Sequence, residues 1–314
     1  MVSRLKCASF FAGVGGIELG FKNHINLIYA NEFNLNSQKT YEKNFNLNLD
    51  TNDIQHLDIE KLPNFDILLA GFPCQAFSIA GYREGFNDKK GRGHLFFTLE
   101  KIFKEKQPQI IFLENVKNLV GHDNGKTFAT ILQSLKNANY FVKYMVLNAM
   151  HYGNIPQNRE RVYIVCFKDK ERYKNFDFPL PLKLSKTISD IVDFDLKVDD
   201  KYYYTESNFK NYEMLKSSII KTNTIYQYRR QYVRENKSQV CPTLTANMGT
   251  GGHNVPLVLT KHGIRKLTPK ECFLFQGFPK DFKLPQIANS HLYQQAGNSV
   301  CVSVIERIAN NIFT

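Results

Sequence analysis

Cys74 stands in a loop where a thiol could act as a nucleophile. The loop, residues 71–78 (GFPCQAFS), directly follows the apolar run 66–70, which predicts a buried strand. Open α/β sheets place their active sites at the carboxyl ends of such strands. A free thiol has a pKa of about 8.5, so a nucleophilic cysteine needs basic groups or loop amides nearby to ionise. An isolated cysteine is more often a buried structural residue, but the surrounding octapeptide favours a reactive Cys74.

An acid and two arginines could assist such a thiol. Glu114 ends the predicted strand 109–113, where a half-buried carboxyl group has a raised pKa and can donate a proton to a ring nitrogen or hold it. The alternative is a strand-end acid that caps the next helix. Arg159 and Arg161 lie two positions apart on an extended segment, so we expect both on one face, orienting a phosphate or a base carbonyl. A pair of surface charges is the alternative.

A glycine-rich turn follows the first predicted strand. Gly13, Gly15 and Gly16 would let a ligand approach the backbone closely. Their G-x-G-G spacing departs from G-x-G-x-x-G, which weakens a dinucleotide-binding interpretation. Glu32, just after the second predicted strand, could hold ribose hydroxyls, and Asp53, expected after a third strand, could meet an adenine amino group. Each acid could instead be a solvated surface residue.

The elements that would position these residues alternate between strands and helices. The predicted strands are 5–11, 27–30, 65–70, 109–113, 142–147 and 161–167, and the predicted helices include 17–21, 96–104, 128–135 and 299–312. This alternation predicts an α/β fold with a mostly parallel, doubly wound sheet. Residues 186–262 are polar, tyrosine-rich and irregular. We therefore expect an α/β domain over 1–185, a smaller irregular domain over 186–262, and a return to the first domain over 263–314.

Composition limits the function classes. Lysine and arginine outnumber aspartate and glutamate by 41 to 29, and the net charge of +12 favours a polyanionic partner, with nucleic acid first. The six cysteines are scattered without a CxxC pair, which argues against a zinc site and a disulfide scaffold. No apolar run approaches the roughly 18 residues of a membrane span. The N-terminus is typical of a strand rather than a signal peptide, so we expect a cytoplasmic protein.

Six segments, taken in order, closely resemble the motifs of the bacterial cytosine-C5 DNA methyltransferase family. They are the glycine turn at 10–16, the Pro-Cys-Gln loop at 73–75, Glu-Asn-Val at 114–116, Gln-x-Arg-x-Arg at 157–161, RKLTPKEC with QGFP over 265–279, and QAGNSV at 295–300. The resemblance spans nearly the whole chain except about 186–240. It implies a Rossmann-like S-adenosylmethionine-dependent methyltransferase domain with a smaller target-recognition domain at 186–262.

The resemblance also implies the chemistry. Cys74 attacks C6 of cytosine, Glu114 engages N3 and the exocyclic amine, and Arg159 and Arg161 place the target nucleotide and Cys74. C5 then takes a methyl group from S-adenosylmethionine, which leaves as S-adenosylhomocysteine, without a metal. Loss of the C5 proton expels the thiolate, so covalent catalysis divides one hard step into easier ones.

Ten residues match the family's positions around S-adenosylmethionine. They are Phe11, Gly13, Gly15, Glu32, Phe33, Asp53, Ile54, Pro73, Leu95 and Asn298. The family commonly has tryptophan where this chain has Phe33, and the chain contains no tryptophan. The aromatic partner of adenine is therefore replaced conservatively.

The resemblance also implies that residues 186–262 recognise DNA. The target cytosine must leave the base stack before its C5 and C6 can react. Arginines there could read guanine in the major groove, although a solvated basic loop is the alternative. The residues that match a DNA-facing strip or recognition loop are Arg229, Arg230, Arg234, Thr243, Thr245 and Gly251. The region resembles those of enzymes that read interrupted sites such as GCNGC.

The resemblance implies partners as well. These are double-stranded DNA and, within a restriction–modification system, a cognate endonuclease that is not expected to bind directly. The enzyme is expected to be a monomer in the bacterial cytoplasm, associated with the nucleoid when bound to DNA.

Other functions compete with this one. A tRNA cytosine-C5 methyltransferase shares the catalytic order but would lack a full DNA-recognition domain, for which about 75 residues are available here. A catalytically silent DNA-binding relative would not need the intact Cys74, Glu114, Arg159 and Arg161. An NAD-dependent oxidoreductase is disfavoured by the glycine spacing and the Pro-Cys-Gln loop. Adenine and cytosine-N4 enzymes should carry an Asp/Ser-Pro-Pro-Tyr/Phe tetrapeptide, which this sequence lacks.

Overall fold

The computed structural model describes residues 4–73, 95–250 and 254–314. The predicted nucleophile Cys74 and the predicted DNA contact Gly251 lie outside the described residues. Internal contacts divide the chain into two compact units. The first unit comprises Met1–Leu147, Glu160–Leu180 and Val304–Thr314, and the second comprises Asn148–Arg159 and Pro181–Ser303.

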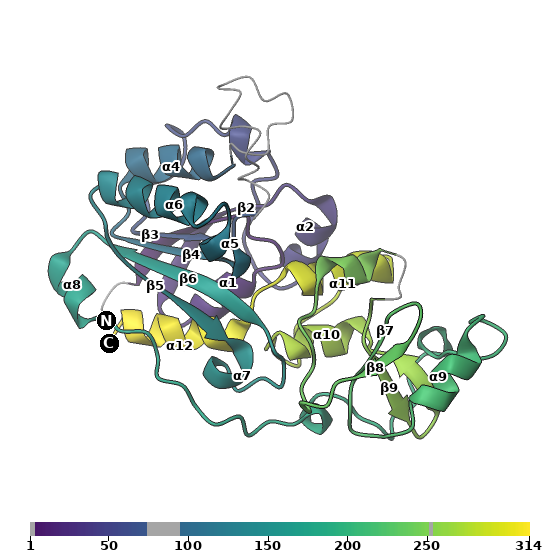
Figure 1. Ribbon diagram of the computed structural model, residues 1–314. Helices are drawn as coiled ribbons and strands as arrows, with labels where there is room; N and C mark the ends of the chain where they lie inside the picture. Colours follow the sequence, from purple (N-terminus) through teal and green to yellow (C-terminus); the bar gives the residue numbers. More distant parts are fainter. Residues whose placement is uncertain (1–3, 74–94, 251–253) are drawn as a thin grey trace. The chain divides into compact units, whose positions relative to one another are not determined.

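A six-stranded sheet forms the centre of the first unit (Figure 1). Its strands are β1 (Leu5–Phe10), β2 (Ile25–Asn31), β3 (Ile67–Ala70), β4 (Ile110–Val116), β5 (Phe141–Asn148) and β6 (Glu160–Phe167), in the order β2-β1-β3-β4-β6-β5. The first four strands pair in parallel, whereas β6 runs antiparallel to β4. The predicted α/β class is confirmed, and the sheet is mixed at the β6 side.

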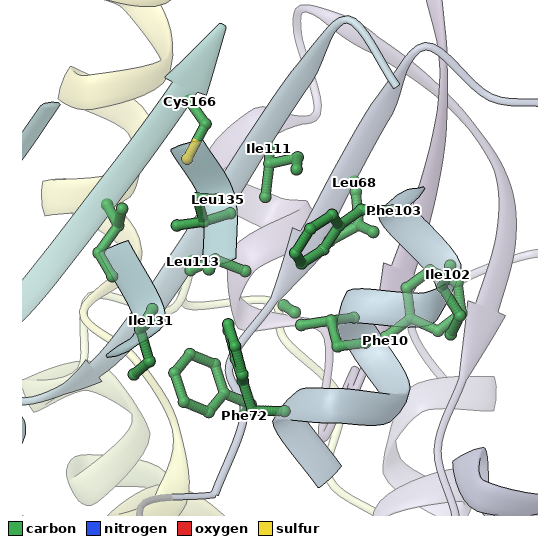
Figure 2. Close-up of a cluster of buried hydrophobic side chains, with 14 of the residues drawn as sticks. Phe10, Leu68, Phe72, Ile102, Phe103, Ile111, Leu113, Ile131, Leu135 and Cys166 are labelled. Carbon is green, nitrogen blue, oxygen red and sulfur yellow. The ribbon is translucent and has the colours of Figure 1, made fainter. Parts of the chain in front are cut away.

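Helices cover both faces of this sheet. They are α1 (Gly16–Phe21), α2 (Leu35–Glu42), α4 (Leu95–Lys106), α5 (Asn118–Gly121), α6 (Lys126–Asn137), α8 (Lys170–Asn175) and α12 (Val302–Ile312), with a 3₁₀ turn η1 (Ile54–His56). Figure 1 shows α4 and α6 on one face and α12 on the other. Figure 2 shows side chains of β1, β3 and β4 meeting those of α4 and α6, including Phe10, Leu68, Phe103 and Leu135, all fully buried. Continuous apolar strands are expected in a sheet that is covered on both faces.

The strand expected before Asp53 is replaced by a single bridge. Asp50 pairs in parallel with Asn31, and its N–H donates to the Ala30 carbonyl at 2.9 Å. The Asp50 carboxylate then accepts the backbone N–H of Asn52 at 3.0 Å, and Asp53 accepts that of Gln55 at 2.9 Å. Short polar side chains that bond their own backbone compete with strand pairing, which explains why the ladder stops after one residue.

The second unit contains a small antiparallel sheet and several short helices. The strands are β7 (Tyr226–Tyr228), β8 (Val233–Glu235), β9 (Leu257–Thr260) and β10 (Gly263–Lys266), in the order β10-β9-β7-β8. The helices are α7 (Ala149–Tyr152), α9 (Tyr212–Ser218), α10 (Pro269–Phe275) and α11 (Asn289–Asn298), with 3₁₀ turns η4 (Ile188–Asp190), η5 (Asp200–Tyr202) and η6 (Ala246–Gly249). Its core is a cluster of Leu215, Ile219, Tyr226, Leu257 and Ile264.

The unit boundaries differ from the expected segments. The second unit begins with Asn148–Arg159, resumes at Pro181 and continues to Ser303, whereas we expected a change at 186 and a return at 263. The reason is local, because α10 and α11 pack against one another and α11 packs against η6. The assignment of target recognition to 186–262 stays a prediction. Among the described helices, none is both long and apolar enough to span a membrane.

Candidate active site

The backbone that leads to Cys74 is held by the end of β4. The Asn115 side-chain amide donates to the Phe72 carbonyl at 2.8 Å, and both residues are buried. A Cβ added at Gly71 would lie 3.7 Å from Oε2 of Glu114. The chain therefore passes close beside the Glu114 carboxylate shortly before it reaches residue 74.

Glu114 and Arg161 form a largely buried ion pair. Glu114 lies near the end of β4 and Arg161 at the start of β6, where the antiparallel register pairs Arg161 with Val116. Nε of Arg161 lies 3.3 Å from Oε1 of Glu114, and their side chains are only 12% and 10% exposed. Breaking a buried pair leaves an uncompensated charge, so this contact fixes both side chains at the strand ends.

Arg159 contacts different groups from Arg161. Its guanidinium is 2% exposed and donates to the backbone carbonyls of Leu244 at 2.8 Å and Gly297 at 3.2 Å, and also to that of Ser299. We expected both arginines on one face of an extended segment. Arg159 instead precedes β6, and its backbone carbonyl accepts the N–H of Ala149 at 2.9 Å. These contacts position protein backbone within the second unit, and direct contact with a nucleotide stays a prediction.

The glycine turn is held by Glu32. Phe11, Gly13 and Gly15 adopt positive φ angles of 54°, 58° and 85°. The Glu32 carboxylate accepts the N–H of Gly13 at 2.8 Å and that of Asn34 at 2.6 Å. Burial raises the pKa of Glu32, and these two hydrogen bonds partly offset that effect. Glu32 thus organises the turn as well as being a candidate for ribose binding.

The surroundings of this turn fit an adenosine-type ligand. Among the described residues, a Cβ added at Gly13 would meet only the Phe11 carbonyl, at 4.0 Å, so this part of the structure leaves space beside the backbone. The Phe33 ring is 66% exposed and could stack on a base, while Ile54 is buried beside the half-buried Asp53. Three further residues are predicted to bind the cofactor. Pro73 is exposed and Leu95 is half-buried. Asn298 is exposed and is the last residue of α11 in the second unit.

Gly15 has a packing role in this turn. A Cβ at this position would lie 2.0 Å from Cε2 of Phe45, and the φ angle of 85° is unfavourable for any side chain. We expect Gly15→Ala to destabilise the protein by about 1–3 kcal/mol, as overpacking usually does, and to lower the melting temperature. Gly121→Ala is the matched control, because no described atom lies within 4 Å of its Cβ. Equal melting temperatures for the two variants would contradict this assignment.

Two buried polar residues have contacts that the sequence did not reveal, although Gln157 begins the Gln-x-Arg-x-Arg segment. Gln157 donates to the Phe275 carbonyl at 2.5 Å and accepts the N–H of Leu244 at 3.2 Å, so it ties three segments of the second unit together. Glu18 is 2% exposed within α1. Its only sequence signal was an acid among the apolar residues Ile17 and Phe21.

A basic row lies on the hairpin formed by β7 and β8. Gln227 and Arg234 are directly opposed, and the Arg229 guanidinium donates to the Gln227 side-chain carbonyl at 3.1 Å. Arg229, Arg230 and Arg234 are all exposed. Glu235 points to the other face, as the strand alternation requires, and pairs with Lys221 at 3.0 Å.

The other predicted DNA contacts lie beside η6. The Thr243 hydroxyl donates to the Asn158 carbonyl at 2.6 Å, whereas Thr245 is exposed. The η6 segment packs closely on α11, since a Cβ at Gly297 would lie 2.1 Å from the Thr245 backbone. A Cβ at Gly249 would lie 2.4 Å from the Ser290 carbonyl oxygen. Among the described residues, no group of three or more histidine, cysteine or acidic side chains could hold a metal.

A family model and curated relatives match nearly the whole chain. The family model described as C-5 cytosine-specific DNA methylase matches residues 5–314. The Type II methyltransferase M.Bsp6I of Bacillus sp. (strain RFL6) is 58% identical over 311 residues, which cover 98% of each chain. The Type II methyltransferase M.SsoII of Shigella sonnei is 39% identical over 315 residues, covering 99% of this chain and 80% of the relative.

Solved structures show the same fold. A DNMT2 variant of Spodoptera frugiperda matches with a TM-score of 0.76 and 21% identity, over 99% of this chain and all of that chain. At this identity the likeness concerns the fold alone. The family match and the relatives together identify the chain: it belongs to the C-5 cytosine-specific DNA methylase family.

Proposed function

We propose that this chain, a DNA (cytosine-5-)-methyltransferase, is the modification enzyme of a type II restriction–modification system. Its relatives M.Bsp6I and M.SsoII are both named Type II methyltransferases. The observation that carries the proposed chemistry is the Glu114–Arg161 pair, which lies at the ends of two neighbouring strands beside the backbone that leads to Cys74. In the bacterial cell the enzyme acts as a monomer on duplex DNA and does not bind its cognate endonuclease.

In the proposed reaction, the Cys74 thiolate adds to C6 of a cytosine flipped out of the duplex. Flipping costs a few kcal/mol, which contacts with DNA must supply. Glu114 holds a proton at N3. The C5=C6 π electrons displaced by the thiolate therefore form a C4=C5 enamine, while the electrons of the C4=N3 bond move to the protonated N3, and C5 becomes nucleophilic. Arg161 keeps the Glu114 carboxylate in place. After C5 is methylated, a base removes the C5 proton, and the S–C6 bond breaks to release the thiolate.

S-adenosylmethionine, when bound, supplies the methyl group from its sulfonium and leaves as S-adenosylhomocysteine. Phe33 would stack on its adenine, Asp53 and Ile54 would contact the adenine edge, and Glu32 would hold the ribose. Gly13 leaves room for the ligand beside the backbone. These roles follow the family pattern, and the open turn and the exposed ring support them.

The test is a methyl-transfer assay with labelled donor on duplex DNA and on tRNA. Transfer to duplex DNA alone is expected, and the Cys74→Ser variant should transfer no methyl group to it. Transfer to tRNA alone would overturn the choice of substrate, and full activity of Cys74→Ser would overturn the covalent step.

Reading of the DNA site is proposed for the β7–β8 hairpin. We expect Arg234→Ala to weaken discrimination at one guanine of the site by about 1–3 kcal/mol, which is the usual value of a bidentate arginine–guanine contact. Bisulfite sequencing of host DNA would show both the site, expected to be of the GCNGC kind, and relaxed methylation by the variant. Lys216→Ala, an exposed change on α9, is the control. An unchanged site preference in Arg234→Ala would contradict base reading by Arg234.

A further inference from the structure

Glu18 is a buried acid without an ordinary hydrogen bond. It lies in α1, is 2% exposed, and neither of its carboxylate oxygens has a hydrogen-bond partner among the described residues. The hydroxyl groups of Ser9 in β1 and Tyr41 in α2 are also buried and have no partner within the same part of the chain. Three elements therefore turn polar atoms into the interior beneath the glycine turn.

This arrangement is costly for the fold alone. Burial of a polar group without a partner costs free energy, and burial of a charge costs more. Burial raises the pKa of Glu18 to about 7, although the dipoles of the nearby Ser9 hydroxyl and of the backbone at Ile17 and Glu18, which do not form geometrically good hydrogen bonds with it, partly offset the effect. A neutral amide would fill the same space without the cost of a buried charge, so the carboxylate has a role other than packing.

The titratable groups that face Glu18 are all acidic. Glu32, which follows β2, raises the pKa of Glu18 further. Burial raises the pKa values of Cys7 in β1 and Tyr41 in α2, and the Glu18 carboxylate adds to that increase. No basic side chain acts on Glu18 from these elements. The interior under the turn thus has negative potential and lacks a compensating cation among the described residues.

The position of Glu18 indicates which cation would compensate it. Ser9 lies near the carboxyl end of β1, the turn follows, and Glu18 lies three residues beyond Gly15. Ligands of open α/β sheets bind at these strand ends. The proposed methyl donor carries a positive sulfonium that its product lacks, and a buried carboxylate acts more strongly on such a charge than an exposed one does.

We propose that Glu18 is a positioning residue for the methyl donor, the buried counter-charge that favours the sulfonium ligand over its neutral product. The inference rests on the proposed use of S-adenosylmethionine. Glu18 is sealed from solvent, so it acts through the turn and not by touching the ligand. Ionised Glu18 strengthens binding of the sulfonium, and protonated Glu18 does not. The preference for donor over product should therefore rise between pH 6 and pH 8.

The test measures dissociation constants by calorimetry for S-adenosylmethionine and S-adenosylhomocysteine at pH 6, 7 and 8. Both ligands share the adenosine and amino-acid ends, so the ratio of the two constants cancels contacts with those shared groups, including the proposed ribose contact of Glu32, and the Glu18→Gln variant then isolates the part due to Glu18. In the unaltered chain the ratio should favour the donor about tenfold more at pH 8 than at pH 6. In Glu18→Gln the ratio should be independent of pH and equal to the pH 6 value.

Glu42→Gln, an exposed acid of α2, is the control and should behave as the unaltered chain does. A ratio that does not change with pH in the unaltered chain would overturn the inference, whether or not Glu18→Gln folds. So would a Glu18→Gln variant that keeps the full pH 8 preference. If neither ligand binds the unaltered chain, the proposed cofactor fails instead, so the two failures are distinguishable.

Discussion

Replacing Glu114 with glutamine should lower kcat about 10²–10⁴-fold, the usual contribution of a positioned acid or base. An amide can still accept a hydrogen bond, but it cannot hold a proton at N3 of the target cytosine. The substitution also removes the charge that fixes Arg161 at 3.3 Å, so the nucleotide would lose a second positioned group. Single-turnover methyl transfer at saturating DNA measures this step.

Glu160→Gln provides the matched control for this experiment. Like Glu114, Glu160 is an acid at one end of a strand, here the start of β6. Its side chain, however, is 42% exposed and pairs with Lys117. Exposed pairs contribute only about 0–1 kcal/mol, so the variant should keep its activity. A Glu114→Gln variant that transfers methyl groups within fivefold of the unaltered rate would remove Glu114 from the chemistry.

Glu271→Ala should destabilise the protein by about 3–5 kcal/mol, because it leaves the charge of Arg265 buried without its partner. Arg265 is fully buried, and its two Nη atoms lie 2.8 and 2.6 Å from the Glu271 oxygens. Glu271 also accepts the N–H of Thr268 at 2.7 Å and completes the capping box of α10. Urea denaturation of the full chain, followed by circular dichroism, measures the loss.

Two further variants sharpen that measurement. Glu213→Ala removes an exposed acid of α9 that lies 3.9 Å from Lys216, and it should change the stability by less than about 1 kcal/mol. The double variant Arg265→Met with Glu271→Leu removes both charges, and it should recover much of the loss. Equal denaturation midpoints for Glu271→Ala and Glu213→Ala would show that the buried pair contributes little.

The strands of the sheet and the family motifs could be predicted because short, continuous stretches of sequence indicate each of them. A continuous apolar run such as that of β3 indicates a doubly covered strand, and the glycines after β1 indicate a tight turn. The family follows from motif order, since six short segments in one sequence order are far more specific than any one alone. The family match over residues 5–314 confirms that prediction.

Contacts distant in the sequence could not be predicted. Arg159 donates to the backbone of Leu244, Gly297 and Ser299, which lie 85–140 residues away, and backbone carbonyls leave no signal in the sequence. Glu18 was missed because only the packing of three elements reveals that its carboxylate is buried. The prediction of a strand before Asp53 was wrong because of local contacts, not distant ones. Polar side chains there bond their own backbone and end the strand pairing.

The backbone contact between η6 and α11 has a consequence for divergence among such enzymes. Gly249 and Gly297 bring main chain against main chain, so the stability of this contact does not depend on the hairpin side chains Arg229, Arg230 and Arg234, which project into solvent. Under the proposed reading of DNA by this hairpin, substitutions among those arginines would alter which DNA sequence is preferred without weakening the scaffold that carries them. Descendants of one ancestral gene would then acquire new target sites by a few surface changes, because selection on folding leaves those positions unconstrained.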